Sequence, residues 1–270
     1  MVKLFDSEGY RFMEGVLLDA GRELSRRVGN RLGFQVKSDT SIVTEADLAS
    51  EAAIISKIKA HFPNDIIYSE EAGLSHTHRV PGEFIWIIDP LDGTTNFANG
   101  YPFYCVSIGR GQFTVSGTIE VVEAGILDGA RSRIYYARKG HGAYVDRKPI
   151  KVAQPRDFSK NFLVTGFYYM QGPELLSQIE RFARVAEKCQ TVRRDGAAAL
   201  DLALVAEGIF DAFWETGLQP WDVAAGSLLV SEAGGHVRNY GARDNQVYNI
   251  ESPGIIAGVK ETVQTIAGLL

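Results

Sequence analysis

Two aspartates lie three residues apart, directly after an apolar run, in FIWIIDPLDGTTNF, residues 84–97. Five apolar residues precede Asp89, and Asp92 follows after a proline and a leucine. A strand that is apolar on both faces is typical of the interior of a sheet. Ligand sites in such sheets gather at the carboxyl ends of strands. We therefore expect the carboxylates of Asp89 and Asp92 to face a binding site.

The residues after Asp92 are typical of a helix start. Gly93, Thr94, Thr95 and Asn96 follow it, and the free N–H groups and positive dipole end of a helix N-terminus suit a phosphate group. Two carboxylates beside an anion repel it, and crowded carboxylates force one of them to stay protonated. A bound cation resolves both conflicts. The segment therefore predicts a site that holds a cation and a phosphate group together.

Further carboxylates occur where the same pattern would place them. Glu70 and Glu71 follow the short apolar segment IIYS, and Asp222 lies at the start of an expected helix. The five histidines show no ligand spacing, and a site built only from oxygen ligands suits Mg²⁺, with Mn²⁺ or Ca²⁺ as competitors. Each acid also has an ordinary interpretation: a solvated Glu-Glu pair, an acid that complements a helix dipole at Asp222, and a capping box between Thr44 and Asp47.

The composition is that of a globular protein and limits the expected partners. The chain has 270 residues, of which 45% are hydrophobic and 23% charged, so it fits one large domain or two packed halves. Its net charge of −5 argues against a large nucleic-acid surface but not against a local basic patch. No apolar run reaches the roughly 18 residues of a transmembrane span, and acidic residues interrupt the N-terminal segment, unlike a signal peptide. The two cysteines, far apart in the sequence, favour free thiols and a cytoplasmic location.

The hydrophobic periodicity predicts helices that alternate with strands along the chain. The expected helices cover residues 8–28, 45–60, 173–188, 197–206 and 221–232, with one more at the C-terminus. The expected strands cover residues 66–68, 84–88, 103–109, 114–127, 134–137, 162–165, 209–214 and 254–257. This order predicts an α/β or α+β layered sandwich with a sheet in each half. We expect an N-terminal half, 1–153, with most of the metal ligands, and a C-terminal half, 154–270, with Asp222 and the substrate pocket, packed as one unit.

Six segments of the sequence resemble the inositol monophosphatase family in order and spacing, over nearly the whole chain. They are VTEAD (43–47), SEEAG (69–73), WIIDPLDGTTNF (86–97), VRRDGAAALDLALVAEG (192–208), FWETG (213–217) and PWDVAAGSLLVSEAGG (220–235). The resemblance implies a layered αβαβα sandwich, usually in homodimers. It also implies a Mg²⁺-dependent phosphatase that is sensitive to lithium.

The resemblance implies a set of metal ligands. Glu70 and Asp89 would hold a first Mg²⁺, with the carbonyl group of Leu91 as a further ligand. Asp89, Asp92 and Asp222 would hold a second Mg²⁺. A third and weaker Mg²⁺ would use Glu70 and water.

The resemblance also implies the catalytic and substrate-binding residues. The amide groups of Gly93 and Thr94 would bind phosphate, the Thr94 hydroxyl paired with Asp47 would orient the attacking water together with Glu70, and Asp92 would lie near the leaving oxygen. The substrate would contact Glu70, Leu91, Asp92, Gly93, Thr94, Arg193, Gly196, Ala197, Ala198, Glu215 and Asp222. The chain has Asp195 and Ala197 where family members often carry Ser or Thr, so the resemblance leaves the substrate open.

We expect hydrolysis of inositol 1-phosphate to inositol and phosphate by metal-activated water. The alternative substrates within the family are histidinol phosphate, fructose 1,6-bisphosphate and 3′-phosphoadenosine 5′-phosphate. A different class of function is a binding role with RNA or the transcription machinery. A haloacid-dehalogenase-type phosphatase, with a nucleophilic aspartate, would carry D-x-D-G-T, whereas this chain has D-x-x-D-G-T at residues 89–94.

Overall fold

The computed structural model describes residues 2–5, 7–28, 34–36, 42–167, 172–241 and 246–270. The helices are α1 (Val2–Phe5), α2 (Glu8–Ser25), α3 (Glu45–His61), α4 (Thr94–Ala98), α5 (Pro173–Ala186), α6 (Ala198–Ala206), α7 (Pro220–Glu232) and α8 (Lys260–Leu269), with a 3₁₀ turn at Phe158–Lys160. The strands β1 (Phe34–Val36) and β2 (Ile42–Thr44) form a small antiparallel pair. Within these residues, none of the helices is long and apolar enough to span a membrane.

The larger sheet has eight strands in the order β10-β9-β8-β7-β6-β5-β3-β4. These strands are β3 (Ile66–Ser69), β4 (Gly73–Leu74), β5 (Phe84–Asp92), β6 (Cys105–Phe113), β7 (Ile119–Asp128), β8 (Arg133–Arg138), β9 (Ala143–Val145) and β10 (Lys148–Ile150). Neighbouring strands are antiparallel except β3 and β5, which are parallel. The carboxyl ends of β3 and β5 therefore meet at one edge of the sheet.

The smaller sheet has five strands in the order β12-β11-β13-β15-β14. These strands are β11 (Phe162–Thr165), β12 (Thr191–Arg193), β13 (Ala212–Thr216), β14 (His236–Asn239) and β15 (Gly254–Gly258). β11 is parallel to both β12 and β13, whereas β15 runs antiparallel to β13 and β14.

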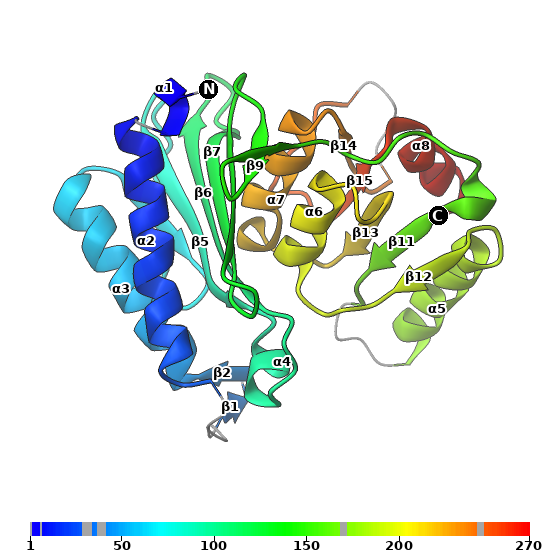
Figure 1. Ribbon diagram of the computed structural model, residues 1–270, viewed down its shortest axis with the longest axis horizontal. Coiled ribbons are helices and arrows are strands. Elements are labelled where there is room, and N and C mark those ends of the chain that lie inside the picture. The colour runs from blue at the N-terminus through cyan, green and yellow to red at the C-terminus, as the bar shows by residue number, and fades with distance from the viewer. Residues whose placement is uncertain (1, 6, 29–33, 37–41, 168–171, 242–245) are drawn as a thin grey trace.

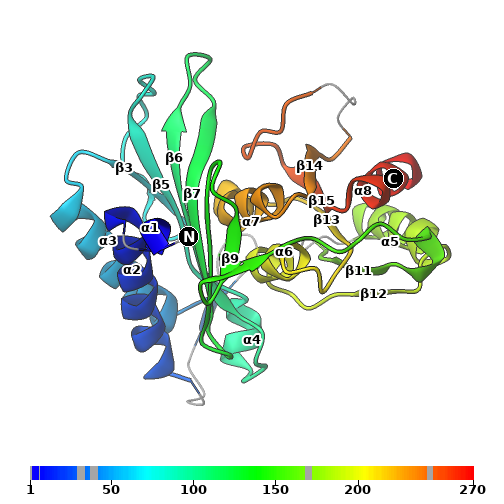
Figure 2. The ribbon, with the colours of Figure 1, turned by 45° about the horizontal axis from the view of Figure 1, so that its top comes forward.

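The helices and sheets stack in five layers (Figures 1 and 2). Helices α2 and α3 cover one face of the larger sheet, α6 and α7 lie between the two sheets, and α5 and α8 cover the outer face of the smaller sheet. The expected αβαβα sandwich is confirmed. In the sequence, the strands of the larger sheet all precede residue 153 and those of the smaller sheet all follow it. One apolar cluster includes buried residues of both sheets. The division into halves at that residue stays a prediction.

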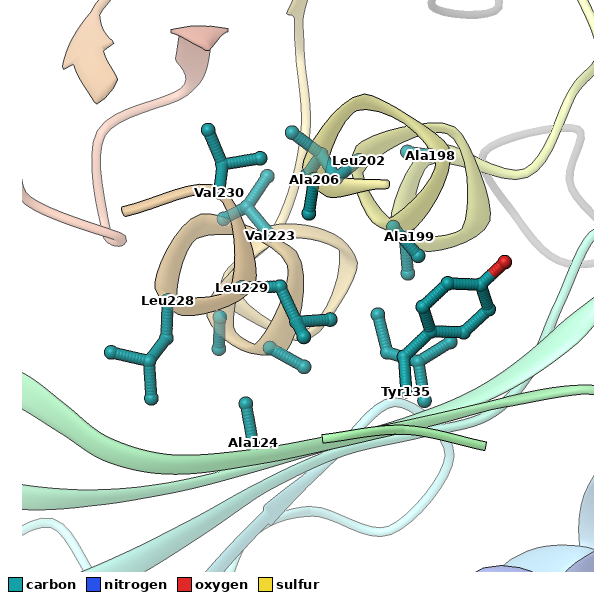
Figure 3. Close-up of a cluster of buried hydrophobic side chains, with 14 of the residues drawn as sticks. Ala124, Tyr135, Ala198, Ala199, Leu202, Ala206, Val223, Leu228, Leu229 and Val230 are labelled. Carbon is teal, nitrogen blue, oxygen red and sulfur yellow. The ribbon is translucent and has the colours of Figure 1, made fainter. Parts of the chain in front are cut away.

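Helix sequence decides which layer each helix occupies. In α2 the buried side chains, among them Tyr10, Met13, Leu17 and Leu24, follow one face at helical spacing, so the opposite face can stay in water. Helices α6 and α7 are apolar on nearly all sides, which suits a layer buried between two sheets. In Figure 3, Ala199, Leu228 and Leu229 point toward the larger sheet, and other labelled side chains of the two helices lie between them. A Cβ at Gly226 would lie only 2.5 Å from Leu202, so this glycine permits the close approach of α7 to α6.

Some element bounds differ from the prediction. The strand expected from residue 114 begins at Ile119, because Thr114–Thr118 forms a turn in which the amide of Thr114 donates to the carbonyl of Thr118 at 2.9 Å. Helix α2 ends at Ser25, and the expected stop at residues 29–30 lies outside the described residues. The strands β9, β10, β12 and β14 were not predicted, because each has only three or four residues.

Candidate functional site

The site begins where β3 and β5 end together. Ser69 pairs with Ile88 in the parallel register, and the amide of Glu70 donates to the carbonyl of Ile88 at 3.1 Å. Glu70 therefore leaves β3 beside Asp89 on β5. Between Asp89 and Asp92 the pairing of β5 with β6 shifts by a bulge, a feature that re-aims side chains near active sites.

A cleft at this edge brings together residues of both halves of the sequence. Its lining residues are Glu70, Asp89, Leu91, Asp92, Gly93, Thr94, Thr95, Gly166, Phe167, Arg194, Gly196, Ala197, Ala198, Asp201, Glu215, Gly217, Leu218, Gln219, Trp221 and Asp222. The set includes nearly all of the predicted site residues. Arg193 does not line the cleft: its guanidinium lies 5.1 Å from the centre of the Phe162 ring and donates to the Thr191 hydroxyl. Asp47 lies behind the cleft wall and reaches it through Thr94.

Asp89, Asp92 and Asp222 each have one oxygen held by a backbone amide. Asp89 accepts from the amide of Leu91 at 3.0 Å, and Asp92 accepts from the amide of Ala199, in α6, at 2.7 Å. Asp222 accepts from the amide of Gln219 at 2.7 Å, as the acidic member of the capping box that starts α7. The sequence assigned Asp222 both a helix-start role and a cleft role, and the structure places it in both.

The acidic side chains of the cleft repel one another. Burial raises the pKa of Asp89 well above its ordinary value, and the charges of Glu70, Asp92 and Asp222 raise it further. Burial, together with the charge of Glu70, raises the pKa of Asp92 to about 7 against the hydrogen bond from Ala199. Asp89 is only 2% exposed. A cation in the cleft would remove this repulsion.

The donor set fits a hard divalent cation. The predicted ligands are the carboxylates of Glu70, Asp89, Asp92 and Asp222 and the carbonyl group of Leu91. All of them supply oxygen, which Mg²⁺, Mn²⁺ and Ca²⁺ prefer. Among the described residues, no three Asp, Glu, His or Cys side chains already stand in the arrangement of a formed metal site. The oxygen donors therefore line one cleft, and the assignment of individual residues as metal ligands stays a prediction.

The turn after Asp92 packs closely against the backbone of Phe103. Gly93 has φ +88°, and a Cβ there would lie 2.9 Å from the carbonyl oxygen of Phe103, so only glycine fits without strain. It precedes α4, and both Gly93 and Thr94 line the cleft. Their role in binding phosphate stays a prediction.

Thr94 and Asp47 form a hydrogen-bonded pair. The Thr94 hydroxyl lies 3.0 Å from Asp47 Oδ1 and 3.0 Å from the carbonyl of Leu91. The other Asp47 oxygen accepts from the amide and the hydroxyl of Thr44, at 2.8 and 2.6 Å, as the capping box of α3. The two interpretations of Asp47 are therefore compatible, because each carboxylate oxygen serves one of them. Asp47 is fully buried, and burial raises its pKa.

Two further carboxyl groups that line the cleft are buried. Burial raises the pKa of Glu215 and of Asp201 well above the ordinary values. Glu215 lies directly over Gly166, where a Cβ would be 2.0 Å from Oε2. Asp201 Oδ1 is buried without a hydrogen-bond partner among the described residues. Arg194 also lines the cleft, and its charge opposes the rise in the pKa of Glu215.

The sequence did not predict several lining residues, among them Arg194, Asp201 and Gly166. Arg194 follows Arg193 directly, and the two residues differ in their contacts: Arg193 packs on Phe162, whereas Arg194 packs against Phe167 of the cleft. Asp201 lies within an apolar helix, where an acid was the only signal. Gly166 had no signal in the sequence. Asp195 does not line the cleft, and its carbonyl accepts from the side chain of Asn96 at 2.8 Å.

Comparison with known proteins identifies the family. The model of the inositol monophosphatase family matches residues 6–269. The inositol-1-monophosphatase of Synechocystis sp. is 41% identical over 225 residues, which are 83% of this chain and 76% of that protein. The Nus factor SuhB of Xylella fastidiosa is 36% identical over 251 residues, 92% of this chain and 86% of that protein.

Solved structures agree with the sequence comparison. The extragenic suppressor protein suhB of Bartonella henselae superposes with a TM-score of 0.87 and 32% identity, over 97% of this chain and 98% of that chain. The inositol monophosphatase of Anabaena (Nostoc) sp. superposes with a TM-score of 0.80 and 35% identity, over 96% of this chain and 93% of that chain. With its cleft, its fold and these similarities, the chain belongs to the inositol monophosphatase family.

Proposed function

We propose that this protein hydrolyses inositol 1-phosphate to inositol and phosphate, with Mg²⁺ as its cofactor. The observation that carries the proposal is the single cleft that joins Glu70, Asp89, Asp92 and Asp222 to the hydrogen-bonded pair of Thr94 and Asp47. Membership of the family supports a phosphatase. The name of the Synechocystis relative supports the substrate.

The family is metal-dependent, and the oxygen donors favour Mg²⁺, with Mn²⁺ as a substitute. Glu70, Asp89, the Leu91 carbonyl, Asp92 and Asp222 would hold two to three ions. When bound, Mg²⁺ lowers the pKa of water and stabilises the charge on the attacking and leaving oxygens of phosphate hydrolysis.

The remaining catalytic work falls to the residues around α4. The amides of Gly93 and Thr94 would bind the phosphate oxygens. A Thr94 hydroxyl that donates its proton to Asp47 keeps lone pairs free to accept from the attacking water, which it would orient together with Glu70. Asp92 would lie beside the leaving oxygen. Positioning of this kind supplies much of the rate in phosphoryl transfer, because the protein contributes little covalent chemistry.

Two carboxyl groups of the cleft favour a polyol over an acidic alcohol. Glu215 and Asp201 line the cleft together with Gly196, Ala197 and Ala198, whose side chains are small or absent. A ring of hydroxyl groups can donate to these carboxyl groups, whereas a second phosphate group would bring negative charge toward them. Inositol 1-phosphate therefore suits the cleft better than fructose 1,6-bisphosphate.

The proposed function is tested by phosphate release from four substrates. With millimolar Mg²⁺ we expect the largest kcat/KM for inositol 1-phosphate, and smaller values for histidinol phosphate, fructose 1,6-bisphosphate and 3′-phosphoadenosine 5′-phosphate. EDTA should abolish release from all four. Release that persists in EDTA, or a clear preference for one of the other three, would contradict the proposal.

Glu215→Gln should impair substrate binding more than metal binding. The carboxyl group offers two acceptors to substrate hydroxyls, whereas the amide offers one acceptor and one donor. Loss of one such hydrogen bond, about 1.4 kcal/mol, raises KM about tenfold. Two quantities are measured: KM for inositol 1-phosphate, which should rise, and the Mg²⁺ concentration that gives half-maximal rate, which should stay unchanged. Glu232→Gln, on α7 outside the cleft, is the control and should change neither.

A second candidate function rests on the relatives named Nus factor SuhB, such as the one in Xylella fastidiosa. We infer that a role with the transcription machinery can accompany catalysis, in a protein that acts as a homodimer. The test is binding to RNA polymerase by the wild-type protein and by Asp89→Asn, with sedimentation to measure the oligomeric state. Binding by both proteins would support a separate surface, and binding by neither would remove this candidate.

A further inference from the structure

A buried carboxylate on α3 holds the loop that carries Glu70. Glu51 is 7% exposed, and its Oε1 accepts three hydrogen bonds: from the Ser69 hydroxyl, from the amide of Glu71 at 3.1 Å and from the amide of Ala72 at 3.0 Å. The donors lie immediately before and after Glu70. No ion pair joins Glu51 to a cation among the residues that the structure describes. The loop itself therefore satisfies this buried charge.

Glu51 belongs to a polar stripe on one face of α3. Asp47, Ser50 and Glu51 are spaced at i, i+3 and i+4, which places them on the same side of a helix. Asp47 binds the Thr94 hydroxyl, and the Ser50 hydroxyl donates to the carbonyl of Pro90 at 2.7 Å. One helix face thus contacts the start of α4, the turn between the two aspartates of β5, and the loop after β3. All three segments carry residues of the cleft.

The backbone of Glu70 is fixed from two sides. Its own amide donates to the carbonyl of Ile88, and both of its neighbours donate to Glu51. The chain then turns back at Gly73, which has φ +70°, to form β4. With its backbone fixed, Glu70 has only its side-chain rotations to lose when its carboxylate binds an ion, so less entropy is lost on binding.

We propose that Glu51 is a positioning residue that sets the metal affinity of the cleft by fixing the backbone around Glu70. This inference rests on the proposed function, because it takes Glu70 to be a metal ligand. Glu51 itself does not line the cleft. Loss of a partner that orients a metal ligand typically lowers metal affinity or activity by about 10- to 100-fold.

The test is Mg²⁺ and Mn²⁺ binding, measured by calorimetry and by the metal-induced rise in melting temperature. Glu51→Ala should weaken binding by about tenfold or more, since all three hydrogen bonds are lost. Glu51→Gln keeps the Oε1 acceptor and should bind within about twofold of wild type. Ser69→Ala removes one donor and should cause a smaller shift in the same direction. It keeps the test decisive if Glu51→Ala does not fold.

Ile58→Val is the matched control, because it loosens core packing further along α3 without touching the loop. It should lower the melting temperature and leave metal affinity unchanged. Glu51→Ala or Ser69→Ala with wild-type metal affinity would overturn the inference, since only a structural role would remain. A wild-type protein that binds neither metal would overturn the proposed function as well. A protein that binds metal but releases no phosphate would overturn only the activity.

Discussion

Asp89→Asn is expected to abolish metal-dependent hydrolysis while the fold survives. Asp89 is central to the acidic cleft, because the charges of Glu70, Asp92 and Asp222 all act on it. Loss of this charge should weaken metal binding and cost about 4 kcal/mol of transition-state stabilisation, about a thousandfold in rate. The asparagine Oδ1 can still accept from the amide of Leu91, so the turn keeps its hydrogen bond. Phosphate release measures the loss of rate, and calorimetry with Mg²⁺ measures the loss of metal binding.

The same variant should be more stable than wild type without metal. A carboxyl group whose pKa is raised on folding binds more protons in the folded state, so stability falls as pH rises above its ordinary pKa of 3.8. The asparagine of the variant carries no charge, so the gain should be present at pH 7 and vanish below about pH 3.8, where both side chains are neutral. Thermal unfolding in EDTA measures this difference. Added Mg²⁺ should reverse the order, because it stabilises only the protein that binds it.

Asp211→Asn provides the control for buried charge. Asp211 is fully buried, accepts from Arg156 and from the amide of Phe162, and lies outside the cleft. Its loss leaves partners unsatisfied, so the variant should be less stable at pH 7 and keep its Mg²⁺ dependence. If Asp89→Asn behaved in the same way, the cleft would not be an electrostatically strained metal site.

Local sequence signals predicted the elements that deliver the site but not every residue in it. The run before Asp89, the proline after it and the glycine at Gly93 act over a few residues, so a strand, a turn and a helix start could be read directly. The start of α7 at Asp222 was readable for the same reason. Each of these features depends on backbone chemistry that the nearby residues dictate.

The missed residues depend on contacts between distant segments. Arg194, rather than Arg193, faces the cleft because of how the segment after β12 packs, and no local pattern distinguishes two adjacent arginines. Gly166 matters because Glu215, on the neighbouring strand β13, lies over it. Glu51 was not predicted, because no local pattern distinguishes it from other acids of a helix. Its proposed role follows from the pairing of β3 with β5, which places the Glu70 loop beside α3.

Thr94→Ala is expected to lower kcat about 10²- to 10⁴-fold, the range for a residue that helps to activate the attacking water. KM and Mg²⁺ affinity should change little, because the methyl side chain leaves the amide of residue 94 and the carboxylates of the cleft in place. Thr94→Ser keeps the hydroxyl and should restore most of the rate. A loss of Mg²⁺ affinity equal to the loss of rate would instead assign Thr94 to metal binding.

The pairing of Thr94 with Asp47 is tested by a double-mutant cycle. Asp47→Asn leaves one acceptor oxygen where wild type has two, so the side chain can serve either the Thr44 cap or the Thr94 hydroxyl but not both. Its kcat should fall in the same range as that of Thr94→Ala. If the two side chains act as one unit, the double variant should be no slower than the slower single variant. Losses that multiply would show that Asp47 acts through the α3 cap alone. Thermal unfolding separates that cap effect, because it should appear in Asp47→Asn and be absent from Thr94→Ala.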